Sequence, residues 1–213
     1  MSLESLLRSN RVVPVVVLQK VEHAVPLARA LLKGGVNSME ITLRTDAGLA
    51  SIEAVAKQVP EITVGAGTVI NAQQYKDAVN AGAKFIVSPG LTPALAETSR
   101  QHSVHFLPGV VTPTEVITAL QEGFRLLKFF PASLFGGQGV LKQYGSVFPD
   151  ALFCPTGGID QHNASGYLTL PNVVAVGGSW MTPKDAVAEG DWELISAIAQ
   201  ESLGSILTPI PWD

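Results

Sequence analysis

Short, almost continuously apolar segments alternate with segments of helical composition along the whole chain. A continuous apolar run, rather than a strict alternation of apolar and polar residues, is typical of parallel strands that are covered by helices. The pattern predicts eight strands, at residues 12–18, 38–43, 62–65, 85–88, 105–110, 125–130, 151–155 and 173–176.

The intervening segments carry the signals that start and stop helices. Residues 21–33 have apolar positions at helical spacing and end at Gly34-Gly35, and residues 47–58 and 71–80 are similar. Three Thr-Pro pairs combine a capping residue with proline at the first helical position. They are Thr92-Pro93, Thr112-Pro113 and Thr182-Pro183, and the last pair precedes the predicted final helix.

The predicted strands begin about every 20 to 26 residues, which is the length of one strand, one helix and two short loops. Eight such units close most simply into a (β/α)8 TIM barrel of the α/β class. An open doubly wound sheet is the alternative, because periodicity does not show closure. We find no linker or change of composition, so we predict one domain over residues 1–213, with a short helix at about 2–9 and the barrel at about 12–207.

Composition narrows the classes of function. The chain has 213 residues, 46% of them hydrophobic, and its 14 Lys and Arg against 18 Asp and Glu give a net charge of −4. A mildly acidic protein has no overall field that attracts nucleic acid or an anionic membrane, so any anionic ligand has to be held by local groups. The single cysteine, the N-terminal residues and the lack of an apolar run of about 20 residues predict a cytoplasmic protein that does not enter membranes.

The second predicted strand has a polar face. Glu40, Thr42 and Arg44 alternate with apolar residues, so all three side chains share one side of the strand. The apolar side suits the layer of helices, and the polar side therefore faces the barrel interior, with Arg44 at the C-terminal rim. A structural ion pair is the alternative interpretation, because charges are rarely buried without a partner.

The sixth predicted strand carries Lys128 in the middle of the apolar run at residues 126–131. A buried ammonium ion is costly, and burial favours the neutral, nucleophilic amine that Schiff-base formation requires. A lysine that only pairs with Glu40 is the alternative, although pairing and catalysis do not exclude each other.

Glycine pairs follow the last two predicted strands, as Gly157-Gly158 and as Gly177-Gly178 before Ser179. Glycine lets backbone N–H groups approach an anion, and phosphate commonly binds at these loops of a barrel. We interpret Gly65-Ala66-Gly67 and Ser88-Pro89-Gly90 as turns, and Thr68 as a possible carboxylate ligand. The four histidines are scattered and predict no metal site, and we expect Cys154 and the three tryptophans to serve packing.

Five segments in this order resemble the 2-keto-3-deoxy-6-phosphogluconate (KDPG) aldolase family, also called the bifunctional 4-hydroxy-2-oxoglutarate (KHG) aldolase family. They are residues 39–45 (MEITLRT), 65–69 (GAGTV), 128–132 (KFFPA), 154–158 (CPTGG) and 177–180 (GGSW). The resemblance extends from about residue 12 to 192.

The resemblance implies a class I aldolase that uses no metal or other cofactor, functions in the Entner–Doudoroff pathway and assembles as a homotrimer. It implies that Lys128 forms the Schiff base, that Glu40 is the acid/base, and that pyruvate and a phosphorylated keto acid are the ligands. The remaining predicted site residues divide into two groups: Arg44, Thr68, Pro89, Phe130 and Thr156 bind the substrate, and Gly157, Gly158, Gly178 and Ser179 bind its phosphate.

One departure from the family concerns the loop after Lys128. A glutamate often follows the Pro-Ala of this loop in the family, whereas this chain has Ser133 there. The difference leaves aldehyde specificity open, including the galactonate epimer of the substrate. A metal-dependent aldolase, a phosphosugar isomerase or epimerase and a non-catalytic phosphosugar-binding barrel are the alternatives outside the family.

Overall fold

The computed structural model describes residues 2–207. Its strands are β1 (Val12–Val16), β2 (Ser38–Thr42), β3 (Thr63–Gly67), β4 (Phe85–Val87), β5 (His105–Leu107), β6 (Gly109–Val110), β7 (Leu126–Phe129), β8 (Leu152–Pro155) and β9 (Val176–Gly178). Its helices are α1 (Leu3–Asn10), η1 (Val21–His23), α2 (Ala24–Lys33), α3 (Gly48–Gln58), α4 (Ala72–Asn80), α5 (Pro93–Arg100), α6 (Pro113–Gln121), η2 (Ser133–Phe135), α7 (Gly137–Val147), α8 (Ala164–Leu168), α9 (Lys184–Glu189) and α10 (Trp192–Leu207).

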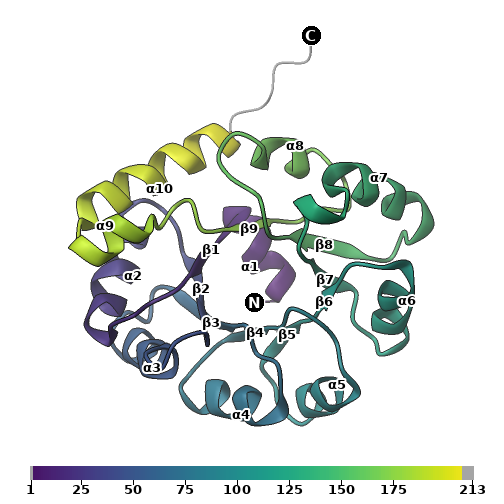
Figure 1. Ribbon diagram of the computed structural model, residues 1–213, viewed down its shortest axis with the longest axis horizontal. Helices are drawn as coiled ribbons and strands as arrows, with labels where there is room; N and C mark the ends of the chain where they lie inside the picture. The colour runs from purple at the N-terminus through teal and green to yellow at the C-terminus, as the bar shows by residue number, and fades with distance from the viewer. Residues whose placement is uncertain (1, 208–213) are drawn as a thin grey trace.

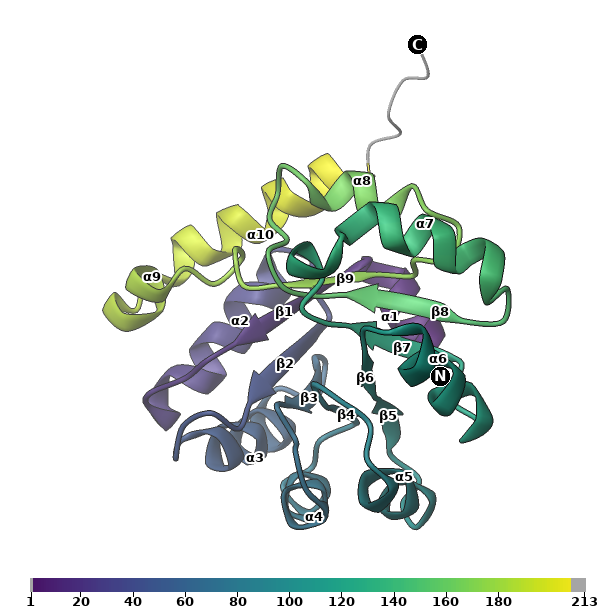
Figure 2. The same ribbon diagram turned by 45° about the vertical axis from the view of Figure 1, so that its right-hand side comes forward.

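The strands are parallel and curl around a common axis, with the helices after α1 around the outside (Figures 1 and 2). Six strands form one sheet in the order β5-β4-β3-β2-β1-β9, and β6-β7-β8 form a second. The structure is therefore an α/β fold with a curled parallel sheet of the TIM-barrel-like type, as the spacing of the apolar segments predicts.

The predicted strand at residues 105–110 is two strands, which is a correction. Proline has no N–H to donate to a ladder, and Pro108 separates β5, which pairs with β4, from β6, which pairs with β7. The carbonyl of Pro108 still accepts from the N–H of Lys128 at 2.8 Å. This residue thus lies where the chain passes from one sheet to the other.

Apolar side chains form two layers, one on each side of the strands. Met39 and Ile41 of β2 are fully buried in the outer layer, between the strands and the helices. The inner layer is smaller and includes Val13, Phe85 and Cys154. The alternation predicted for β2, with its apolar face toward the helices, is confirmed.

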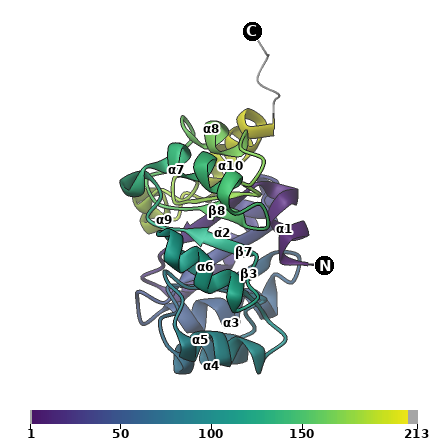
Figure 3. The same cartoon turned by 90° about the vertical axis from the view of Figure 1, so that its right-hand side faces the viewer.

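Helix α1 covers the end of the sheet at which the strands begin (Figure 3). The side chain of Ser2 accepts from the N–H of Ser5 at 3.2 Å and starts the helix. Leu3, Leu6 and Leu7 are buried and pack with the inner layer of the strands. The predicted N-terminal helix is confirmed, and its leucines fill the interior of the curled sheet at the end where the strands begin.

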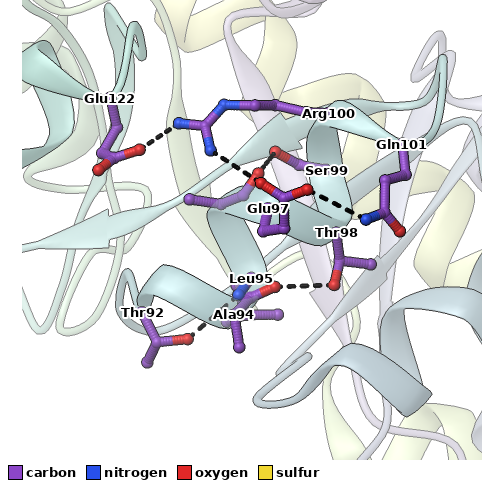
Figure 4. Close-up of polar contacts among 10 residues, drawn as sticks. Thr92, Ala94, Leu95, Glu97, Thr98, Ser99, Arg100, Gln101 and Glu122 are labelled. Atoms are coloured by element: carbon purple, nitrogen blue, oxygen red, sulfur yellow. Dashed lines mark hydrogen bonds and ion pairs between the residues drawn. The ribbon is translucent and has the colours of Figure 1, made fainter.

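Two of the three Thr-Pro predictions are confirmed and one is wrong. Thr92 caps α5 (Figure 4), and Thr112 caps α6 in a capping box with Glu115. Thr182 caps no helix, because Pro183 is the residue before α9 and the Thr182 hydroxyl donates to the Ser179 carbonyl at 3.4 Å. Helix α9 is also followed by a longer helix, α10, so it is not the final one.

Helices α5 and α6 are joined at the surface by charged side chains. Arg100 of α5 pairs with Glu122, which follows α6, and with Glu97 of its own helix (Figure 4). Exposed pairs of this kind contribute little to stability, because water and salt screen the charges. The apolar layers rather than these pairs hold the helices to the sheet.

The segment predicted as one helix at residues 21–33 begins with the 3-10 turn η1 and continues as α2. Among residues 2–207, no helix is both long enough and apolar enough to cross a bilayer. Residues 208–213, with Trp212, lie outside the described residues. The single domain over residues 1–213 stays a prediction.

Candidate active site

Lys128 of β7 and Glu40 of β2 meet inside the curled sheet. Lys128 Nζ lies 3.3 Å from Glu40 Oε1, and the two side chains are only 5% and 4% exposed. The Phe130 ring lies 5.2 Å from the same Nζ. The inward direction expected for both charged side chains is therefore confirmed, and so is the pairing that was the alternative interpretation.

Gly67 leaves the space that the Glu40 carboxylate occupies. A Cβ atom at residue 67 would lie 2.1 Å from Glu40 Oε1, which is far inside contact distance. Gly67 ends β3 opposite Thr42 of β2, so residues 65–67 belong to a strand and their interpretation as a turn is wrong. Glycine at alternate positions 65 and 67 is the signal in the sequence that indicates an interior strand face.

Arg44 and Thr68 form a second polar pair, just beyond the ends of β2 and β3. Arg44 Nε donates to Thr68 Oγ1 at 3.0 Å. Thr68 has a φ of +57°, a left-handed conformation that is unfavourable for a β-branched residue. This backbone places the hydroxyl against one edge of the guanidinium, and none of the ion pairs among the described residues involves Arg44. Arg44 is thus oriented while its charge is not neutralised.

A cleft of about 930 Å³ opens at the end of the sheet at which the strands finish. Ligand pockets usually have volumes of about 300–1,000 Å³. Six of the predicted site residues line it: Arg44, Phe130, Thr156, Gly157, Gly158 and Ser179. The others, Glu40, Lys128, Thr68, Pro89 and Gly178, are not in its wall.

The loop after β8 carries two glycines in left-handed conformations. Gly157 and Gly158 have φ values of +99° and +71°, which other residues rarely adopt. The loop after β7 lies against them, because the N–H of Ser133 donates to the Gly157 carbonyl at 3.1 Å. A Cβ atom on Gly158 would lie 1.9 Å from Ser133 Oγ. Sequence reasoning did not predict this contact between the two loops.

Gly178 is placed differently from the prediction. It is the last residue of strand β9, whereas the sequence pattern ended the strand at residue 176. A Cβ atom at this position would meet the Trp180 ring at 2.0 Å, so glycine makes room for that ring. Trp180 Nε1 in turn donates to Ser202 Oγ of α10 at 3.0 Å. The structure thus gives Gly178 a packing role.

Pro89 is exposed and follows β4. A Cβ atom on Gly109 would lie 2.2 Å from the Pro89 backbone, and Gly109 pairs in register with Lys128. Pro89 is therefore close to the Lys128 strand without lining the cleft.

Cys154 lies beside Lys128 in the sheet register and is buried. Burial raises the pKa of the Cys154 thiol to about 12, although the charge of Lys128 acts in the opposite direction. A thiol of this kind is not a nucleophile near neutral pH, in agreement with the expected packing role. The described residues contain no group of three or more His, Cys, Asp or Glu side chains that could hold a metal ion.

Comparisons with known proteins identify the family of the chain. Residues 3–198 match the family model "Aldolase: KDPG and KHG aldolase". The KHG/KDPG aldolase of Escherichia coli (strain K12) is 45% identical over 202 residues, which are 95% of each chain. The 2-dehydro-3-deoxy-phosphogluconate aldolase of Pseudomonas aeruginosa is 40% identical and covers 94% of this chain and 91% of its own.

The structure of KDPG aldolase from Legionella pneumophila, with pyruvate captured as a covalent carbinolamine, superposes with a TM-score of 0.92. It is 40% identical and covers 95% of this chain and 98% of its own. A Zymomonas mobilis aldolase with 3-phosphoglycerate has a TM-score of 0.87 at 42% identity and covers 93% of each chain. Together with the buried lysine and carboxylate, these matches show that the chain belongs to the KDPG and KHG aldolase family and is a class I aldolase.

Proposed function

We propose that the protein reversibly cleaves KDPG to pyruvate and glyceraldehyde 3-phosphate, with Lys128 as the Schiff-base residue, and that it also cleaves KHG to pyruvate and glyoxylate. The observation that carries the proposal is the buried contact of 3.3 Å between Lys128 and Glu40. The names of the bacterial relatives support this choice of substrates.

Covalent chemistry begins at Lys128. The neutral amine attacks the C2 ketone and forms a carbinolamine, and loss of water gives an iminium ion. A carboxylate 3.3 Å from Nζ is in position to take the proton that the amine loses and to return it to the hydroxyl group that leaves as water. The iminium then accepts the electron pair of the C3–C4 bond when that bond breaks.

Glu40 is the acid/base of the cleavage step. Its carboxylate, directly or through a water molecule, removes the proton of the C4 hydroxyl, and the aldehyde leaves. The enamine that remains takes a proton at C3, and hydrolysis of the resulting iminium releases pyruvate and restores the amine. A single carboxylate beside the lysine is enough for these proton transfers, so the mechanism uses no metal or other cofactor.

The cleft orients the substrate. Arg44 binds the carboxylate of the pyruvoyl half through a charge-assisted contact, and Thr68 holds the guanidinium in place. Phe130 and Thr156 of the cleft wall bind the carbon chain, together with Pro89, which lies near the Lys128 strand outside that wall. The phosphate lies at Gly157, Gly158 and Ser179, and at Gly178 through its backbone, where it contributes binding energy remote from the reacting carbons.

The proposal also includes closure of the curled sheet into a complete barrel. Isolated bridges join Phe153 to Val173 and Thr156 to Gly177, between β8 and the β9 segment. With the passage from β5 to β6 at Pro108, they support a closed eight-stranded (β/α)8 barrel. We extend the proposal to a cytoplasmic homotrimer that functions in the Entner–Doudoroff pathway, as the family resemblance implies.

Borohydride trapping tests the chemistry. We expect incubation with pyruvate and borohydride to add the mass of one reduced pyruvate to the parent protein, and to add nothing to Lys128→Met. The matched control is Lys142→Met, which replaces an exposed lysine of α7 outside the cleft and should be trapped like the parent. Trapping that survives Lys128→Met, or activity that a chelator abolishes, would overturn the proposal.

A further inference from the structure

The cleft continues beyond the glycine loops. Its outer part lies between the segment that follows β1 and the start of α9, and its walls include Lys20, His23, Lys184 and Asp185. Strands β1 and β9 are neighbours in the sheet, which brings these two connections together. The outer part is continuous with the wall that contains Gly157, Gly158 and Ser179.

Two lysines in this outer part have no carboxylate partner. Lys20 and Lys184 are exposed, and neither takes part in any of the ion pairs among the described residues. By contrast, the exposed Lys33 and Lys57 pair with Glu193 and Glu53. No ion pair among the described residues therefore offsets the positive charge of these two lysines in the cleft wall.

The sign and position of these charges matter because the protein as a whole is acidic, with a net charge of −4. A cleft that concentrates one sign of charge raises the local concentration of an oppositely charged ligand. Arg44 lies in the same cleft, and Asp185 is its one acidic wall residue. Lys20 and Lys184 thus add positive charge to the cleft wall that also contains Gly157, Gly158 and Ser179.

We propose that Lys20 and Lys184 are specificity-determining residues that attract and neutralise the dianionic phosphoryl group of the substrate. The backbone N–H groups of the glycine loops fix the position of this group, and the lysines supply the charge that those neutral groups lack. The protein therefore favours phosphorylated over unphosphorylated keto-deoxy acids. This inference rests on the proposed function and adds two residues to its site.

The decisive experiment compares two substrates that differ only in the phosphate, KDPG and 2-keto-3-deoxygluconate. In the double variant Lys20→Gln/Lys184→Gln we expect kcat/KM for KDPG to fall about tenfold, mostly through KM, with kcat/KM for the unphosphorylated acid unchanged. Salt should raise the KM for KDPG in the parent and much less in the double variant. Lys76→Gln/Lys142→Gln is the control, because it removes the same charge from exposed lysines outside the cleft.

Asp185 gives a test of opposite sign. Asp185→Asn removes the acidic group from the cleft, so kcat/KM for KDPG should rise about twofold to threefold while that for the unphosphorylated acid stays constant. Equal losses with both substrates in the double lysine variant, or a loss as large in the control, would overturn the inference. Failure of the parent to be trapped with pyruvate would instead overturn the proposed function, so the two failures are distinguishable.

Discussion

The two ends of the curled sheet contain different kinds of residue. Where the strands begin, leucines of α1 pack with Val13 and Phe85, and the interior is filled with apolar side chains. Where the strands finish, the interior holds Lys128 and Glu40, and glycines leave room around them. The first end resembles an ordinary protein core, whereas the second has a buried charged pair and glycines in place of apolar contacts.

Three glycines at the second end illustrate the difference. A Cβ atom on Gly67 would meet Glu40, one on Gly158 would meet Ser133, and one on Gly177 would lie 2.3 Å from Thr156 Oγ1. At each of these positions, the absence of a side chain on glycine leaves the space that a polar neighbour occupies. We infer that mutations at the first end act on stability, and that mutations at the second end act on the geometry of catalysis.

The largest effect is expected for Gly67→Ala. The new methyl group would displace the Glu40 carboxylate, and a misplacement of about 1 Å in an active site costs about a hundredfold in rate. Stability should fall by only about 1–3 kcal/mol, the usual cost of overpacking. Steady-state kinetics with KDPG and chemical denaturation of the same samples measure the two quantities.

The matched control is Gly139→Ala, because nothing lies within 4 Å of the Cβ position of Gly139 in helix α7. This variant should keep the parent kcat and gain up to about 1 kcal/mol of stability. A kcat for Gly67→Ala within threefold of the parent would show that Glu40 can move without loss.

The opposite behaviour is expected for Leu7→Ala at the first end. Leu7 is 1% exposed, and removal of a buried leucine costs about 2–5 kcal/mol in the free energy of unfolding. The kcat of the folded variant should equal that of the parent, because α1 covers the end of the sheet opposite to the cleft. Denaturation curves and kinetics well below the Tm test both parts.

Leu134→Ala is the control for this pair, since Leu134 is 81% exposed and its loss should change stability by no more than about 0.5 kcal/mol. If the folded Leu7→Ala protein lost kcat as well, the separation of the two ends into stability and catalysis would be wrong.

The difference between the ends also explains what could be predicted from the sequence. Apolar runs locate most strands to within a few residues, and a lysine or glutamate inside such a run is conspicuous, so Lys128 and Glu40 could be identified. The contact between Gly67 and Glu40 could not, because it depends on how two strands lie against each other. The division of one strand at Pro108 likewise depends on which neighbour each half pairs with.

Residues that act through loops are the hardest to predict. Ser133 meets Gly158 only because the loops after β7 and β8 are hydrogen-bonded, and no spacing in the sequence reports this. Lys20 and Lys184 are far apart in the chain and have no motif around them. Their shared cleft follows from the pairing of β1 with β9, the first and last strands.

The smallest effect is expected at Cys154, which tests how far water penetrates the interior of the sheet. This residue pairs in register with Lys128, and burial raises the pKa of its thiol from its ordinary value of 9.0 to about 12. The native protein should therefore not react with iodoacetamide at pH 8, while the unfolded chain reacts, as intact mass would show.

The thiolate of the unfolded chain forms first as pH rises, so the stability that the buried thiol contributes is fully present below pH 9 and is lost progressively toward pH 12. From pH 8 to pH 10 the parent should lose about 1 kcal/mol more than Cys154→Ala, which removes this titration and leaves the tyrosines in place. Rapid native labelling, or the same pH dependence in both proteins, would mean that water reaches the sheet interior beside Lys128, and that the boundary between the two ends lies deeper than Cys154.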